Sequence, residues 1–158
     1  MKIKSPLALI ASVAICELAG VIGSVFTIGS IPTWYAALAK PAFNPPAYLF
    51  GPVWTLLYLL MGVAIYLVYE KGMGNNLGRL AAFAFAIQLS LNALWSIVFF
   101  GMHSLLGGMV VIVALWLSIA ATMILFWRIS RRAAYLMAPY ILWVSFAMAL
   151  NYSLLALN

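Results

Sequence analysis

The sequence predicts an all-α membrane protein, a bundle of five transmembrane helices with a proline-rich first loop. Of its 158 residues, 68% are hydrophobic and 6% are charged, whereas a soluble domain carries about 25% charged residues. Apolar runs of roughly 20 residues, long enough to cross a bilayer as helices, recur along the whole chain. The few basic residues stand in the breaks between these runs, where they set topology.

The predicted spans follow one another without internal repeats or low-complexity tracts, so residues 1–158 are expected to form one domain. Lys2 and Lys4 precede an apolar run, as in a signal peptide. The run continues to Ile28, however, and no A-x-A-like site stands where cleavage would fall, so we expect an uncleaved first span. The break at 101–104 is so short that the third and fourth spans should form a tight antiparallel hairpin. The spans are 6–28, 47–69, 80–100, 105–127 and 133–157, and the breaks between them include 41–46, 70–79, 101–104 and 128–132.

The basic residues predict an N-in, C-out orientation, because cytoplasmic loops carry an excess of Lys and Arg. Only Lys40 falls on the outer side. An all-helical protein of this kind is expected in the inner, cytoplasmic membrane of a bacterium, since outer-membrane spans are usually barrels. The net charge of +6 reflects topology, and we expect no nucleic-acid partner. The residues on the inner side are Lys2, Lys4, Lys71, Arg79, Arg128, Arg131 and Arg132.

The first loop is stiffened by Pro41, Pro45 and Pro46, which fix φ and lack backbone donors. A stiff aromatic loop over a helical bundle suggests a lid above a site for a flat, apolar ligand. The alternative is an ordinary belt of aromatic residues at headgroup level. The aromatic residues of this segment are Trp34, Tyr35, Phe43 and Tyr48.

Polar residues inside a span are costly and need a partner or a purpose. Glu17 lies near the middle of the first span. It could contact a ligand or handle a proton, or it could make a hydrogen bond to a neighbouring helix, which is the interpretation we favour. Gln88, Asn92 and Asn151 are the amides within spans.

Three helix faces carry aromatic residues at a spacing of three or four, and two of these faces also carry the amides. Such faces are expected to line a cavity, because Trp, Asn and Gln carry N–H groups that need partners in lipid. One face comes from the second span, one from the third and one from the fifth. They consist of Trp54 and Tyr58; of Gln88, Asn92, Trp95 and Ser96; and of Trp143, Ala147 and Asn151.

Small residues recur every four positions on two spans, which is the pattern found where membrane helices touch. The stripe on the third span is a candidate interface for a homodimer, although such stripes also occur within a single bundle. The two stripes are Gly78, Ala82, Ala86 and Ser90 on the third span and Ser12, Cys16, Gly20 and Ser24 on the first.

Four blocks of sequence resemble one known family. The blocks WYxxLxKPxFxPP, GPVWTLLY, QLxLNxLWSxxFFG and PYxLWxxFAxxLNY are similar to those of the tryptophan-rich sensory protein / translocator protein (TspO/MBR) family. The resemblance covers residues 20–152. It implies a five-helix bundle, usually a homodimer, that binds porphyrins and other flat hydrophobic ligands. The pocket positions implied in this chain are Trp34, Tyr35, Pro45, Trp54, Tyr58, Asn92, Trp95, Ser96, Trp143 and Ala147.

The chain departs from the family pattern at three places. Phe43 replaces a Trp of the first loop, and Glu17 is not part of the pattern. The cholesterol motif of eukaryotic members lacks its Lys or Arg here, because LLALN follows Tyr152. Cholesterol recognition of that type is therefore doubtful.

The sequence leaves three functions open. The first is binding of a protoporphyrin-like tetrapyrrole, with a sensory, regulatory or transport role, in which Lys40 could pair with a propionate. The second is light-dependent degradation of porphyrin, with Trp95 and Trp143 as candidate catalytic residues; no conventional nucleophile–base pair is present. The third is transport of small molecules or lipids. No cofactor or metal is expected to be required, and His103 is expected to be structural or solvated rather than a haem ligand.

Overall fold

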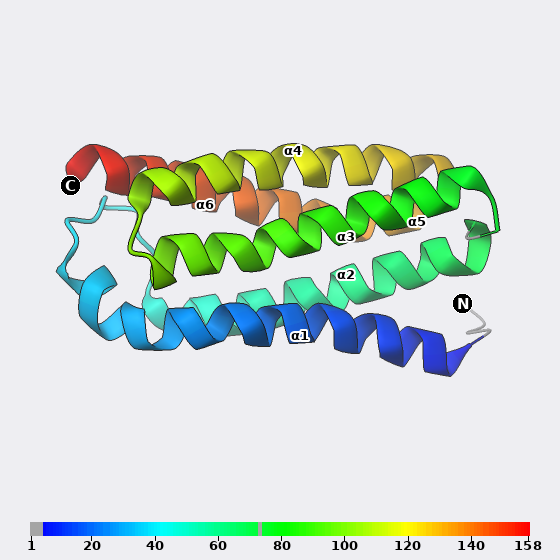
Figure 1. The fold of residues 1–158 in the computed structure, drawn as a ribbon, viewed down its shortest axis with the longest axis horizontal. Helices are drawn as coiled ribbons and strands as arrows, with labels where there is room; N and C mark the ends of the chain where they lie inside the picture. The colour runs from blue at the N-terminus through cyan, green and yellow to red at the C-terminus, as the bar shows by residue number, and fades with distance from the viewer. Residues whose placement is uncertain (1–4, 73) are drawn as a thin grey trace.

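The computed structural model describes residues 5–72 and 74–158, and within that part of the chain all regular elements are helical. Five helical segments are long and apolar enough to span a membrane. Figure 1 shows them running along the long axis of an elongated bundle, with the start of α1 at one end and the C-terminus at the other. The predicted all-α, five-span architecture is confirmed. The spans are Pro6–Tyr35, Ala47–Gly72, Asn76–Gly101, Leu105–Ile129 and Arg131–Leu157.

The first helix is longer than the sequence predicts. Helix α1, Pro6–Ser30, begins where the Ser5 side chain accepts a hydrogen bond from the Ala8 N–H. It then widens into a π-helical turn, η1, Ile31–Tyr35. Pro32 lies in this turn, and its missing N–H favours a departure from regular α-helical bonding. Trp34 and Tyr35 were expected in the loop and instead belong to the last helical turn.

The connection between the second and third spans is very short. A 3₁₀ turn, η2, Ala47–Leu49, leads into α2, Phe50–Gly72. Helix α3, Asn76–Ser96, starts at the Asn75 cap and ends in a second π turn, η3, Ile97–Gly101. The predicted break over 70–79 was therefore too long, because the helices continue through the charged residues that flank it.

The fourth and fifth spans differ in regularity. Helix α4, Leu105–Ile129, is continuous, and its tight turn from η3 contains His103 at a positive φ of 52°. The fifth span was predicted as one helix but is divided into α5, Arg131–Leu136, and α6, Ala138–Leu157. Pro139 explains the division, since it cannot donate the backbone bond that would join the two segments.

The helices pack in a closed arrangement. Helix α1 lies against α2 and α3, α4 lies against α3 and α6, and α5 lies against α2 and α4. The backbones of α1 and α2 approach each other closely: a Cβ at Gly62 would stand 2.5 Å from the Cα of Val13. The α3–α4 hairpin predicted from the short turn is confirmed.

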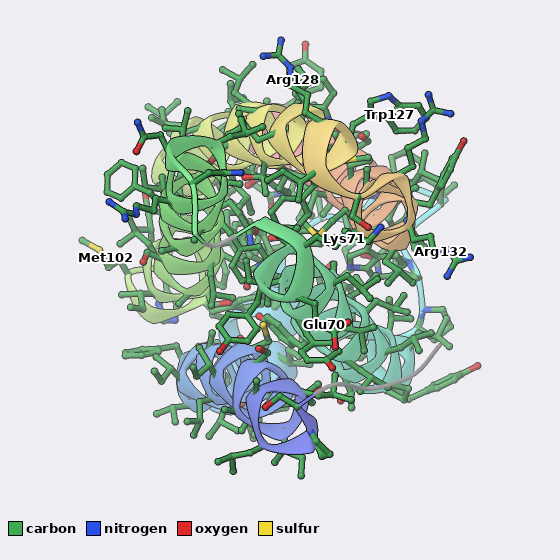
Figure 2. The ribbon with its side chains drawn as sticks, turned by 90° about the vertical axis from the view of Figure 1, so that its right-hand side faces the viewer. Glu70, Lys71, Met102, Trp127, Arg128 and Arg132 are labelled. Carbon is green, nitrogen blue, oxygen red and sulfur yellow. The ribbon has the colours of Figure 1, made fainter. Side chains whose placement is uncertain are left out.

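The basic residues of the described chain gather as the charge pattern predicts. Lys71, Arg128 and Arg132 lie at the end of the bundle that faces the viewer in Figure 2. Lys40 lies in the segment after η1, at the opposite end (Figure 1). Lys2 and Lys4 fall outside the described residues. The assignment of the basic end to the cytoplasm stays a prediction.

The two stripes of small residues have different surroundings. On α1, Cys16 is fully buried and Gly20 lies against the Tyr58 ring, so this stripe serves packing within the chain. On α3, Gly78 is buried, Ala82 is half-buried and Ala86 is exposed. Only the later part of the α3 stripe is therefore open to a partner.

Candidate ligand-binding site

A cavity of about 330 Å³ lies between α1, α2 and the end of α3, in the half of the bundle nearest the first loop. Drug-sized ligands occupy pockets of about 300–1,000 Å³. Its walls are mainly apolar and aromatic. Its lining residues are Glu17, Gly20, Val21, Gly23, Ser24, Thr27, Ile28, Ile31, Ala47, Phe50, Gly51, Trp54, Thr55, Tyr58, Trp95, Ser96 and Phe100.

One stripe of α1 forms the first wall. Its residues are spaced four and three apart, which keeps them on one side of a helix. The stripe adjoins the buried face that carries Cys16, so the cavity opens along the edge of the α1–α2 contact. The glycines of α1 allow close approach: a Cβ at Gly20 would lie 2.7 Å from Tyr58 Cδ2, and one at Gly23 would lie 2.9 Å from Ser96 Oγ. The stripe consists of Glu17, Val21, Ser24 and Ile28, and Ile31 of η1 continues it.

The rings of Trp54 and Tyr58 form the second wall, on α2. They stack with centroids 5.6 Å apart and an interplanar angle of 29°. A buried hydrogen-bond chain fixes the Tyr58 ring, because its hydroxyl donates to Asn92 Oδ1. Asn92 Nδ2 in turn donates to the Tyr140 hydroxyl at 3.0 Å. One amide of α3 thus ties α2 to α6 and holds the aromatic wall in place.

Trp95 forms the third wall, at the end of α3. Its indole Nε1 donates to Asn151 Oδ1 at 3.4 Å, and Asn151 Nδ2 donates to the Leu105 carbonyl at 3.0 Å. The indole ring also stacks on Phe99, with centroids 5.0 Å apart. These contacts orient Trp95 toward α1, where it meets the cavity.

Few polar groups of the lining are free to contact a ligand. The hydroxyls of Ser24, Thr27 and Thr55 each donate to a carbonyl of their own helix. Within residues 5–72 and 74–158, no hydrogen bond is made by the Trp54 indole N–H or by the Glu17 carboxylate. The expectation that Glu17 bonds to a neighbouring helix is therefore wrong. Helix α1 turns Cys16 into the core, and this rotation leaves Glu17 at the cavity.

The cavity brings together four of the predicted pocket residues: Trp54, Tyr58, Trp95 and Ser96. Two amide side chains that were expected to line the cavity are instead buried between the helices. Asn92 is buried in the hydrogen-bond chain, and Gln88 is fully buried, with no hydrogen bond to its amide atoms from the described residues.

The remaining predicted residues do not line the cavity. Trp34 stacks on His103, with ring centroids 4.7 Å apart. That His103 is not a haem ligand stays a prediction. The Tyr35 hydroxyl donates to Asn44 Oδ1 at 2.5 Å, which holds the loop next to Pro45. Trp143, four residues before Ala147 on α6, packs edge-on against Phe50 at 6.2 Å. The roles of these residues in binding stay predictions.

Lys40 is already engaged in the structure. Its Nζ donates to the carbonyls of Ala36 and Leu38, at 2.8 and 3.1 Å, and lies 5.1 Å from the centroid of the Tyr35 ring. It therefore closes the end of the first helix and anchors the loop. A propionate would have to displace these contacts.

Sequence reasoning missed most of the α1 wall. It interpreted Gly20 and Ser24 as helix-contact residues and did not consider Thr27 or Ile31 as lining. A usable signal was present in the sequence, since a carboxylate in mid-span is followed within two turns by Gly20 and Gly23.

The fold and the site define an integral membrane protein with an aromatic cavity between its helices. The model of the TspO/MBR family matches residues 12–157, and the chain belongs to this family. It is 45% identical to "Tryptophan-rich protein TspO" of Chlorobaculum tepidum over 155 residues, which are 98% of each chain. It is 36% identical to human "Translocator protein" over 132 residues, 83% of this chain and 78% of the human protein. "Protein CrtK" of Rhodobacter capsulatus is 42% identical over 143 residues, 90% of this chain and 88% of that one.

Proposed function

We propose that this protein binds a tetrapyrrole or another flat hydrophobic ligand in the cavity between α1, α2 and α3, with a sensory, regulatory or transport role. The observation that carries the proposal is the stacked pair of Trp54 and Tyr58, which lines the cavity together with Trp95. Flat π-systems stack well on such rings. A large macrocycle would enter the cavity from the side of α1, and part of its edge would remain exposed to lipid.

Polar groups near the first loop would orient this ligand. The indole N–H of Trp54 is a donor without a partner in the described chain, so it can meet a carboxylate of a tetrapyrrole. Lys40 is a second donor if it gives up its carbonyl contacts. We place the protein in a bacterial cytoplasmic membrane, in contact with lipid and as a homodimer that uses the exposed part of the α3 stripe.

The test of the proposal is a titration of detergent-purified protein with protoporphyrin IX, followed by quenching of tryptophan fluorescence. Saturable quenching with one site per chain is the expected result, because Trp54 and Trp95 both line the cavity. Quenching that rises linearly with ligand and never saturates would show partition into the micelle, and it would refute the proposal.

A second candidate function is light-dependent breakdown of the bound tetrapyrrole. The observation that favours it is the position of Trp95, which lines the cavity, whereas Trp143 does not. On this hypothesis Trp95→Phe slows bleaching of bound protoporphyrin under light while Trp143→Phe leaves its rate unchanged. Equal bleaching by the wild type and the Trp95→Phe variant would refute it.

A further inference from the structure

The cavity holds a carboxyl group that neither a tetrapyrrole nor the packing of the helices explains. Glu17 is the twelfth residue of the 25-residue helix α1, far from either end. The chain contains only two acidic residues, Glu17 and Glu70. A carboxylate at such a depth is costly, and in membrane proteins it marks a site that meets a partner, an ion or a substrate.

The partner of Glu17 is not in the described part of the chain. Glu17 is half-buried and lines the cavity, and no hydrogen bond or ion pair joins it to residues 5–72 or 74–158. No Lys, Arg or His of those residues lines the cavity either. Glu70 provides the contrast, because it lies near the basic end of the bundle (Figure 2) and accepts a hydrogen bond from the Tyr66 hydroxyl.

The surroundings of Glu17 narrow the chemistry of the partner. The Tyr58 hydroxyl donates to Asn92 and is not available to the carboxylate. The Ser24 hydroxyl, two turns along the same stripe, donates to the Val21 carbonyl. The other donors of the lining, the Trp54 indole N–H and the Ser96 hydroxyl, make no hydrogen bond to it either. The carboxyl group is therefore open to a donor from a ligand. Next to it stand the faces of two aromatic rings, which attract both flat π-systems and cations.

We infer that the cavity selects flat aromatic ligands that carry a basic nitrogen, with the ammonium group on Glu17 and the ring system against Trp54 and Tyr58. The inference shares the cavity with the proposed function, but it does not depend on a tetrapyrrole being the ligand. It adds a second class of ligand, which is positively charged, whereas the propionates of a porphyrin are negatively charged. The protein donors proposed for those propionates lie toward the first loop.

The test compares two probes that differ in one group, 1-pyrenemethylamine and 1-pyrenemethanol. Both carry the same flat ring system, and only the amine is a cation at neutral pH. Binding is measured by energy transfer from tryptophan in a neutral detergent, so that the micelle does not select for charge. We expect the wild type to bind the amine roughly tenfold more tightly than the alcohol, since a charge-assisted hydrogen bond is about twice as strong as a neutral one.

Substitution of the two acids separates a site from general electrostatics. Glu17→Gln should remove the preference by weakening the amine alone, with the alcohol bound as in the wild type. Glu70→Gln is the matched control, because it removes the same charge outside the cavity and should keep the preference. Equal binding of the two probes by the wild type, or a preference that survives in Glu17→Gln, overturns the inference.

Chemical labelling covers the case in which Glu17→Gln does not fold. Dicyclohexylcarbodiimide reacts with carboxyl groups in apolar surroundings, and the label on each acid of the wild type is located by mass spectrometry. The amine should lower the carbodiimide label on Glu17, either by shielding the carboxyl group or by forming an amide with it as the urea leaves. The alcohol should not, and Glu70 is the internal reference for both products. Equal protection by both probes, or protection by neither, overturns the inference.

The two proposals fail in different ways. Saturable binding of protoporphyrin IX without a preference for the amine would overturn this inference and leave the proposed function standing. A preference for the amine that Glu17→Gln removes, with no saturable binding of protoporphyrin, would support this inference and refute the tetrapyrrole as ligand.

Discussion

Gly20 of α1 lies directly against the ring of Tyr58 on α2, so closely that a methyl group at Gly20 would stand 2.7 Å from the ring atom Cδ2. This contact sets the distance between the two helices at the edge of the cavity. It also connects the packing of the helices to the hydrogen bond from Tyr58 to Asn92. Any side chain at position 20 must move the ring or the helix.

Gly20→Ala is expected to weaken ligand binding. The added methyl group turns the Tyr58 ring away from its stacked position and narrows the cavity. We expect the affinity for protoporphyrin IX to fall roughly tenfold, equivalent to about 1.4 kcal/mol, in a fluorescence titration. Gly29→Ala is the control, because a Cβ at Gly29 meets nothing within 4 Å. Unchanged affinity in Gly20→Ala would show that the ligand does not contact this wall.

Gly62→Ala is expected to destabilise the bundle rather than the site. Its Cβ would stand 2.5 Å from the Cα of Val13, and backbone atoms cannot turn aside as a side chain can. Overpacking of this kind costs about 1–3 kcal/mol, so the melting temperature in detergent should fall. Gly51→Ala, on the same helix with open space at its Cβ, should melt like the wild type. A melting temperature for Gly62→Ala equal to that of Gly51→Ala would be inconsistent with the α1–α2 contact.

Asn92→Leu should show what the buried hydrogen-bond chain contributes. The change leaves the hydroxyls of Tyr58 and Tyr140 without their amide partner. An unpaired buried polar group costs about 1–3 kcal/mol, and a clear loss of thermal stability is expected. Ser90→Ala on the same helix removes only a hydroxyl that bonds its own helix. Equal melting temperatures for the two variants would mean that the hydrogen bonds among Tyr58, Asn92 and Tyr140 contribute nothing to stability.

Asn158→Ala is expected to free the first loop. The Asn158 side chain accepts a hydrogen bond from the Ala39 N–H at 2.9 Å and donates one to the Ala39 carbonyl at 3.0 Å. Loss of both bonds should raise deuterium uptake in residues 37–46, while helix α4 exchanges as before. Unchanged uptake in the loop would show that the contacts of Lys40 and Tyr35 hold it without Asn158.

The arrangement of the spans could be predicted from the sequence because membrane physics leaves few choices. Apolar runs of the required length must be helices, and the short break before Ser104 permits only a hairpin. The helix ends were less predictable. Pro32 does not end the first helix and Pro139 divides the fifth, although the same residue type is present in both places. The difference depends on what packs around each turn.

The site was also predictable in part, because the membrane restricts where polar side chains can stand. Trp54, Tyr58 and Trp95 stand out because indole and phenol groups in a bilayer need a purpose. Their neighbours Gly20 and Thr27 do not stand out, since small residues on a membrane helix usually mark contact with another helix. Which face of α1 borders the cavity depends on its rotation about its own axis, and that is fixed by the fit of Val13 against Gly62.

The most direct test of the account is to fill the cavity from α1. Ser24 lines it and bonds only its own helix, so Ser24→Leu should occupy the space without disturbing the fold. Ser90→Leu, on an exposed position of α3, adds the same side chain outside the cavity. In titrations with protoporphyrin IX, the account predicts weaker binding by Ser24→Leu and wild-type binding by Ser90→Leu. Wild-type affinity in Ser24→Leu together with lost affinity in Ala147→Leu would contradict it and place the ligand beside α6.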